Sequence, residues 1–300
     1  METRKLVKTG ADTYTISLPK QWVVNNKLKK GDLLYVNDSG KGLLVTPEQT
    51  EEKPELKEIS IQIDGKDIGT LRRETISAYI NNYNVFVFNG SSLNEKIEDI
   101  RKILDNFLAL EITEQTASKL VAKDYLNMKE FSLPTTIRRM DMIARSMMID
   151  LRDCKDGTAQ ALAYRDYEVD KLFFLVSRLI RAILSETKTT NKTANIEAHS
   201  IWYLAKNIER IADCSKLLAA EFEKLKKRDE ALKAHDAVEK YYSEAAKSYF
   251  NKDKKLADKL IADRLKISEG CAKLQPSVAE IMKVMVDHVR NIAKIAMDSE

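Results

Sequence analysis

From Leu133 onward the chain reads as a succession of long amphipathic helices, and this pattern limits the possible folds more than any other feature. Apolar residues recur at helical spacing, with breaks at residues 155–157, 187–195, 251–253 and 275–276. The 300 residues include only nine glycines and five prolines, which favours long uninterrupted helices. We therefore predict roughly six helices packed as an all-α bundle.

The helical part also contains an internal repeat. The segment Cys154-Lys-Asp156 precedes the helix that carries Asp166, and the similar segment Asn251-Lys-Asp253 precedes the helix that carries Asp263. Because both landmarks recur at the same offset, we predict two three-helix units in tandem. Four methionines of the first unit are expected to fill its core: Met140, Met142, Met147 and Met148.

Two smaller parts precede the helices. Residues 1–47 contain short runs of strand-forming residues separated by turns, with a short helix expected over Lys20–Asn26. So little apolar surface rarely supports an independent core, so we expect this head to form a homodimer.

Residues 55–130 follow after a charged linker and alternate strands with helices in the order βαβαββ. This order predicts a small α/β domain. The expected division is therefore a β-rich head over residues 1–47, an α/β middle domain over 55–130 and a helical bundle over 133–300.

The charge of the chain is concentrated at its N-terminus. The formal net charge is +4, but residues 1–30 contain seven basic residues and only two acidic ones. A basic head on a nearly neutral body is typical of nucleic-acid-binding proteins, although a solvated basic terminus explains the charge equally well. Arg4 and Lys8 have the same parity on an expected strand, and Lys20 lies at an expected helix start. These three residues are the candidate DNA contacts.

Several patterns bear on the compartment in which the chain works. The longest apolar stretch, Leu172–Leu184, is interrupted by Arg178 and Arg181, so we expect no transmembrane segment. No apolar run follows the N-terminal charges, so no signal peptide is expected. Three widely spaced cysteines suit a reducing environment. These patterns together favour a cytoplasmic protein.

Two pairs of acidic residues are the best candidates for chemistry. Asp166 and Asp170 are four residues apart, as are Glu209 and Asp213, so each pair lies on one face of its helix. If these faces meet, four carboxylates converge and require protons or a cation to neutralise them. An all-carboxylate site suits a hard ion such as Fe, Mn, Mg or Ca better than Zn.

The same spacing also fits acidic residues held in salt bridges on helix surfaces. Four basic residues lie close by in the sequence: Arg165, Lys171, Lys206 and Arg210. None of the three histidines lies three residues after a glutamate, which argues against a di-iron oxygen-activating centre. No residue set provides a nucleophile or base beside an open metal position, so we expect no enzymatic activity.

Specific motifs add a family resemblance. The head resembles the AbrB/SpoVT swapped-hairpin DNA-binding domain through Lys5-Leu-Val-Lys8-Thr-Gly10, Thr15-Ile-Ser-Leu-Pro19-Lys20 and Leu28-Lys-Lys-Gly31-Asp32. Residues 133–300 resemble the PhoU family, whose three-helix repeats carry a Glu/Asp-x-x-x-Asp motif. The strongest match is Ala205-Lys-Asn-Ile-Glu209-Arg-Ile-Ala-Asp213. The whole layout is similar to archaeal PhoU-like phosphate uptake regulators with an AbrB-type head.

This resemblance implies a cytoplasmic, dimeric, non-enzymatic regulator of phosphate uptake. The head would bind DNA, and the bundle would dock a component of the phosphate transport or sensing system. The family's metal-binding positions fall on the four acidic residues described above, Asp166, Asp170, Glu209 and Asp213. Two other classes stay open, namely a metal-dependent phosphohydrolase and a bundle that only oligomerises a DNA-binding head.

The second repeat departs from the family motif. Four residues after Asp263 stands Ile267, and four residues before Asp287 stands Lys283. Because a lysine beside an aspartate opposes cation binding, we expect at most one metal cluster per chain.

Overall fold

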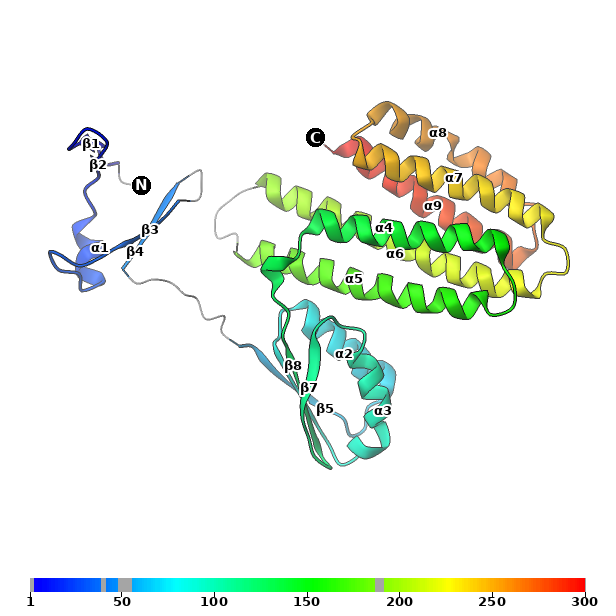
Figure 1. Cartoon of the computed structure of the whole chain (residues 1–300), viewed down its shortest axis with the longest axis horizontal. Helices are drawn as coiled ribbons and strands as arrows, with labels where there is room; N and C mark the ends of the chain where they lie inside the picture. The colour runs from blue at the N-terminus through cyan, green and yellow to red at the C-terminus, as the bar shows by residue number, and fades with distance from the viewer. Residues whose placement is uncertain (1–2, 39–41, 48–55, 187–191, 300) are drawn as a thin grey trace. The chain divides into compact units, whose positions relative to one another are not determined.

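The computed structural model describes residues 3–38, 42–47, 56–186 and 192–299. These residues form two compact units, Met1–Glu55 and Leu56–Glu300 (Figure 1). Most of the expected charged linker, and the first part of the break expected at residues 187–195, lie outside the described residues. The division of the second unit into an α/β domain and a helical domain stays a prediction.

The first unit consists of two small antiparallel ladders and one short helix. Strand β1 (Val7–Lys8) pairs with β2 (Tyr14–Thr15), helix α1 spans Lys20–Asn25, and β3 (Tyr35–Asp38) pairs with β4 (Leu43–Thr46). No side chain described in this unit is buried. Many of its large apolar side chains are exposed, Leu33 to 81%, and the other described ones are only partly buried. A single copy of the head therefore forms no core of its own.

The second unit begins with a four-stranded mixed sheet. Its elements are β5 (Glu58–Gln62), α2 (Ile68–Ile80), β6 (Val85–Asn89), α3 (Leu93–Leu104), β7 (Leu110–Gln115) and β8 (Lys119–Asp124). The strand order is β5-β6-β8-β7, in which β5 and β6 are parallel and the other neighbours antiparallel. The predicted βαβαββ order is confirmed.

Helices α2 and α3 lie on one face of this sheet, as Figure 1 shows. Strand β5 alternates accordingly: Ile61 is buried, whereas Glu58, Ser60 and Gln62 are exposed. Helix α2 begins where the side chain of Asp67 accepts a hydrogen bond from the backbone N–H of Thr70.

The rest of the second unit is all helical. Its helices are α4 (Leu133–Asp150), α5 (Thr158–Glu186), α6 (Lys192–Lys224), α7 (Asp229–Phe250), α8 (Lys254–Cys271) and α9 (Pro276–Asp298). Helices α4, α5 and α6 contact one another, as do α7, α8 and α9, and the two triplets meet through α6 with α9 and α4 with α7. The expectation of six helices in two tandem units is therefore met in the described residues. The charged segment Lys224–Arg228, which the sequence indicates as a helix end, lies where α6 ends and α7 begins.

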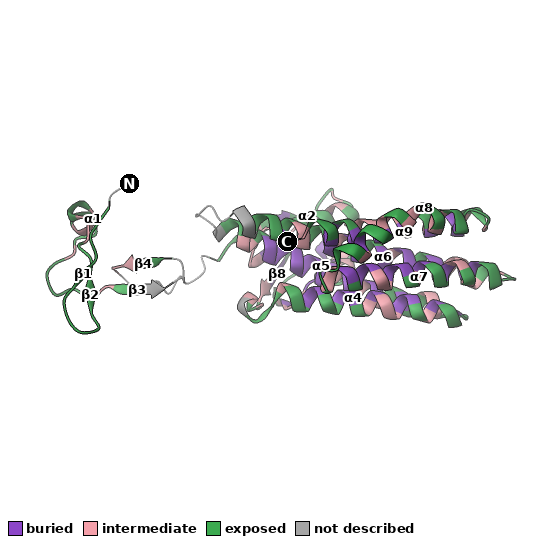
Figure 2. Cartoon of the chain, turned by 90° about the horizontal axis from the view of Figure 1, so that it is seen from above, coloured by how far each residue is buried: buried purple, intermediate pink, exposed green. Residues whose placement is uncertain are grey.

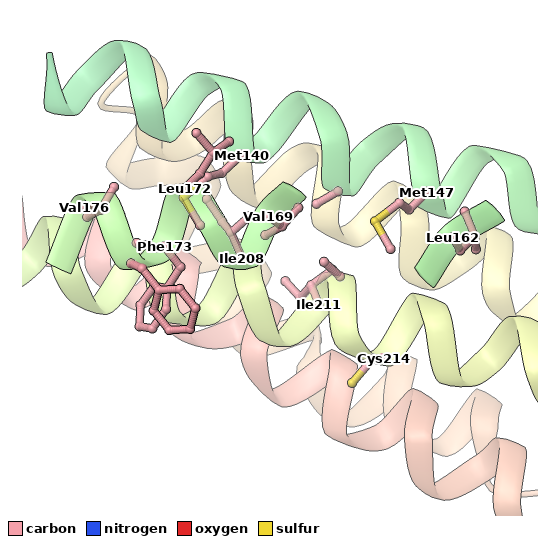
Figure 3. Close-up of a cluster of buried hydrophobic side chains, with 14 of the residues drawn as sticks. Met140, Met147, Leu162, Val169, Leu172, Phe173, Val176, Ile208, Ile211 and Cys214 are labelled. Carbon is pink, nitrogen blue, oxygen red and sulfur yellow. The ribbon is translucent and has the colours of Figure 1, made fainter. Parts of the chain in front are cut away.

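The core of the bundle lies between the helices, where the buried faces meet (Figure 2). Figure 3 shows Met140 of α4 near Leu172 of α5 and Met147 of α4 near Leu162, with Ile211 of α6 in the same cluster. Met148 is also fully buried, but Met142 is 68% exposed, so the core prediction was wrong for that residue. Met142 lies two residues after Met140, a step that turns it to another side of the helix. No helix described here is long and apolar enough to cross a membrane.

Helix α5 also joins the bundle to the α/β part of the same unit. The guanidinium of Arg178 is fully buried, forms an ion pair with Asp124 and lies 4.5 Å from the centre of the Tyr79 ring. Its Nε donates to the side-chain oxygen of Asn82 at 3.2 Å. The Tyr79 ring in turn packs on Phe107, with ring centres 4.5 Å apart. A buried charge and an aromatic contact therefore hold α5 against α2.

Candidate functional site

The four predicted acidic residues come together between α5 and α6. Asp166 and Asp170 lie one turn apart on α5, and Glu209 and Asp213 lie one turn apart on α6. Asp166 and Glu209 are buried, while the other two carboxylates are partly exposed. Asp166, Glu209 and Asp213 all lie close enough to Asp170 to raise its pKa. The two amphipathic faces therefore meet as the spacing suggested.

Lys216, which was not predicted as part of the site, lies among these carboxylates. The ammonium group of Lys216 donates hydrogen bonds to Asp166 of α5 and, at 2.8 Å, to Asp213 of its own helix. Lys216 follows Asp213 by three residues, so the helical acid–base spacing could have revealed it. Its ammonium group ties the two helices together at the centre of the cluster.

Two of the four basic residues weighed from the sequence also contact the cluster. Lys206 lies 2.9 Å from Glu209, and Arg210 lies 3.1 Å from Asp213. The other two pair elsewhere, Arg165 with Asp150 and Lys171 with Glu168. The salt-bridge interpretation is therefore partly correct, since three cations bond to carboxylates of the cluster.

Three cations contact four carboxylates, which leaves one negative charge uncompensated. This excess of negative charge affects the pKa of Asp170. Burial and the neighbouring carboxylates of Asp166, Glu209 and Asp213 raise the pKa of Asp170 to about 7. Burial also raises the pKa of Asp166, although its contact with Lys216 opposes that shift. The Oδ1 atom of Asp166 is buried and has no hydrogen-bond partner among the described residues. The cluster therefore has capacity for one further positive charge.

The fit of a metal ion to this site depends on Lys216. Among the described residues, no three Asp, Glu, His or Cys side chains are arranged so that they could hold a metal ion. Chemically, an all-oxygen donor set fits a hard cation, and the unbonded Oδ1 of Asp166 and the carboxyl of Asp170 are available as ligands. The ammonium of Lys216 stands between Asp166 and Asp213, so a cation would have to replace it there.

The corresponding positions of the second repeat are organised differently. Asp287 of α9 forms an ion pair with Arg264 of α8 at 2.7 Å, and Arg290 approaches it to 4.0 Å. Arg290 follows Asp287 by three residues, as Lys216 follows Asp213. The expectation of at most one metal cluster per chain stays a prediction.

The candidate DNA contacts of the head are all exposed. Lys8 lies in β1, and Lys20 is the first residue of α1. Strand β1 begins at Val7, so Arg4 lies before it, and the expected sharing of strand parity with Lys8 does not hold. DNA binding by these residues stays a prediction.

Comparison with known proteins identifies one domain. Residues 137–221 match the family model of the PhoU domain, a range that covers most of α4–α6 and all four acidic residues. A PhoU domain indicates a regulator of phosphate uptake, and PhoU regulators are generally not enzymes. No domain was identified in the N-terminal part. No curated protein and no solved structure matches the chain.

Proposed function

We propose that this protein regulates phosphate uptake by docking its helical bundle on a component of the phosphate transport or sensing system. The match of residues 137–221 to the PhoU domain carries this proposal. The helices of the bundle share a continuous buried core, which suits a docking role. The proposed role is regulatory, because regulators with a PhoU domain are generally not enzymes.

Phosphate uptake by cells that lack the gene tests this role. We expect uptake at high external phosphate to lose its normal repression, and the wild-type gene to restore it. Capture of the tagged protein from phosphate-replete and phosphate-starved cells should then recover a phosphate transport component in a phosphate-dependent amount. Unchanged uptake in the deletion strain would contradict the proposal.

We further propose that the acidic cluster binds a hard cation in competition with Lys216. The residues that would hold the ion are Asp166, Asp170, Glu209 and Asp213, which would have to rearrange around it once Lys216 is displaced, because no three of them are arranged as ligands in the described structure. The charge of the ion would compensate their mutual repulsion. The unbonded Oδ1 of Asp166 and the raised pKa of Asp170 support this proposal. The ion would replace the ammonium bridge between α5 and α6 with a stronger charge.

Elemental analysis of purified variants tests cation binding. Asp170→Asn combined with Asp213→Asn should lose the bound metal, because the change removes two carboxylate charges with little change in volume. Lys216→Met should retain more metal than the wild type, because it removes the competing ammonium. Glu168→Gln on α5, outside the cluster, serves as the matched control. Equal metal content in all four proteins would rule the cation site out.

The head is proposed to dimerise and to present its basic residues to DNA. Its exposed apolar side chains, including Leu6, Ile16 and Leu33, would be covered by a second copy. The exposed Lys8 and Lys20 would then provide phosphate contacts.

A further inference from the structure

Strand β5 presents an unpaired edge of the sheet. Two backbone bonds fix its orientation: the N–H of Val85 donates to the carbonyl of Lys57, and the N–H of Ile63 donates to the carbonyl of Asn89. In a parallel ladder, alternate residues bond to the same neighbour, so the odd-numbered residues of β5 face β6. The N–H and C=O groups of Glu58, Ser60 and Gln62 therefore point away from the sheet. Among the described residues, no strand pairs with this edge.

The two edges of the sheet differ in how they are protected. The outer strand β7 carries a bulge between Ile112 and Glu114, and bulges and charges hinder strand addition. Strand β5 pairs in unbroken register over all five residues and contains no proline. A groove of about 950 Å³ runs beside it, lined by Ile59 and Ile61 of the strand and by Ala78 and Asn81 at the end of α2, and also by charged side chains that include Lys66, Arg73 and Glu74. The β5 edge is therefore open to an added strand.

We propose that this edge pairs with β5 of a second copy of the chain, which would join two four-stranded sheets into one continuous sheet. The two strands would run antiparallel about a two-fold axis at Ser60. Glu58 would then lie opposite Gln62 of the second copy, and Ile59 opposite its Ile61, so no like charges face each other. A register centred on Glu58 would instead oppose two glutamates.

This register uses the whole outward-facing backbone of the strand. Ser60 would exchange two backbone hydrogen bonds with Ser60 of the second copy, and each Glu58 would do the same with Gln62. The isoleucines of the second copy would lie on the same side of the sheet as α2, because opposed residues share a face. The groove between β5 and α2 would receive them.

The length of chain before β5 favours this occupant. Only residues 47–57 separate β4 from β5. If the heads form the dimer proposed above, each β5 is tethered near its counterpart, and pairing becomes a local event at high effective concentration. The high effective concentration requires the proposed head dimer. The open edge of β5 and its register do not depend on that dimer.

Disulfide trapping in the full chain tests the pairing. The three native cysteines are all buried, so an introduced surface cysteine reports on its own position. Opposed residues in a hydrogen-bonded antiparallel pair have Cα atoms about 5.5 Å apart, within the range that a disulfide spans. We expect Ser60→Cys to form a linked dimer at least about tenfold faster than Ser118→Cys, which replaces another exposed serine, in the β7–β8 turn.

Two further variants fix the register. The double variant Glu58→Cys/Gln62→Cys should link two chains, whereas Glu58→Cys alone should not. Native mass spectrometry of the same samples separates this inference from the head dimer. A native dimer in which Ser60→Cys links no faster than Ser118→Cys overturns the β5 pairing and leaves the head dimer standing. A monomer without linkage overturns both.

Discussion

At the scale of single residues, Asp170 gives the candidate site its pH dependence. Its pKa is about 7 in the folded protein and near 3.8 in an ordinary environment. Because the folded pKa is the higher one, the stabilisation is complete below about pH 4 and is lost as the pH rises through 7. We predict that Asp170→Asn removes this loss and stabilises the protein at pH 8 by on the order of 2 kcal/mol, after allowance for partial exposure.

Thermal unfolding between pH 5 and pH 8 in the presence of a chelator checks this prediction. The matched control is Glu168→Gln, which removes a charge two residues away that pairs with Lys171. The control should retain the wild-type pH profile. Parallel profiles for the wild type and Asp170→Asn would show that Asp170 is ionised throughout this range.

His235 has the opposite pH dependence. Its ring is fully buried, its two nitrogens have no partner among the described residues, and the Phe222 ring meets it edge-on. Burial lowers its pKa to about 4; the carboxylate of Asp236 opposes this shift to a smaller extent, and the cation of Arg152 adds slightly to it. Because the folded pKa lies below the ordinary value of 6.5, stability is lost as the pH falls from about 6.5 towards 4.

We predict that this loss amounts to roughly 3 kcal/mol, following the size of the pKa difference. His235→Leu should flatten the acid side of the stability profile, as measured by urea unfolding at pH 4.5 and pH 7. The exposed His199→Gln is the control and should leave the profile unchanged. An acid loss of the same size in His235→Leu would place its origin elsewhere.

At the scale of elements, α5 connects the acidic cluster with the α/β part of its unit. Arg178 and Asp124 are both almost completely buried. Removal of one partner leaves the other charge buried and unpaired, which typically costs about 3–5 kcal/mol. We predict a loss of this size for Arg178→Met and for Asp124→Leu, and a much smaller loss for the double variant. A double-mutant cycle from urea unfolding measures this coupling, and additive losses would contradict it.

The elements themselves could be predicted from local patterns. Alternation and periodicity predicted the βαβαββ order and the breaks between helices at residues 155–157, 251–253 and 275–276, because these signals depend on neighbours along the chain. The charged segment Lys224–Arg228 indicated a helix end, and α6 does end at Lys224. The acid pairs at 166/170 and 209/213 could be found by spacing alone.

The contacts between elements could not be predicted in the same way. The sequence spacing indicated Lys206 and Arg210 as possible salt-bridge partners of the acidic residues. The position of Lys216 between Asp166 and Asp213 depends on how α5 and α6 pack against each other. Arg178 interrupts an apolar run, which indicates a charged residue in apolar surroundings. The sequence does not indicate that its ion-pair partner is Asp124. The open edge of β5 depends on strand order, which a single sequence does not specify.

At the scale of the whole molecule, DNA binding by the head is a prediction that solution measurements can test. We predict binding to mixed-sequence duplex DNA that weakens steeply with salt, because phosphate contacts release counterions. Replacing Lys8 and Lys20 with alanine should lower affinity at every salt concentration and reduce the salt dependence. Replacing the bundle residues Lys226 and Lys227 is the control for total charge. Fluorescence anisotropy at low and moderate salt measures the effect, and a wild-type dimer that binds no DNA would make the head an assembly module.

The buried joint of Arg178 and Asp124 also bears on how such a chain evolves. Either residue without the other would leave a buried, unpaired charge that destabilises the fold. The two residues lie 54 positions apart in the sequence, one in the α/β part and one in α5. A gene fusion that transplanted the α/β part without α5 would leave Asp124 unpaired and uncover Phe107, which packs on Phe174 of α5. We therefore expect these two parts to be inherited together, and substitutions at positions 124 and 178 to appear in descendants as a matched change.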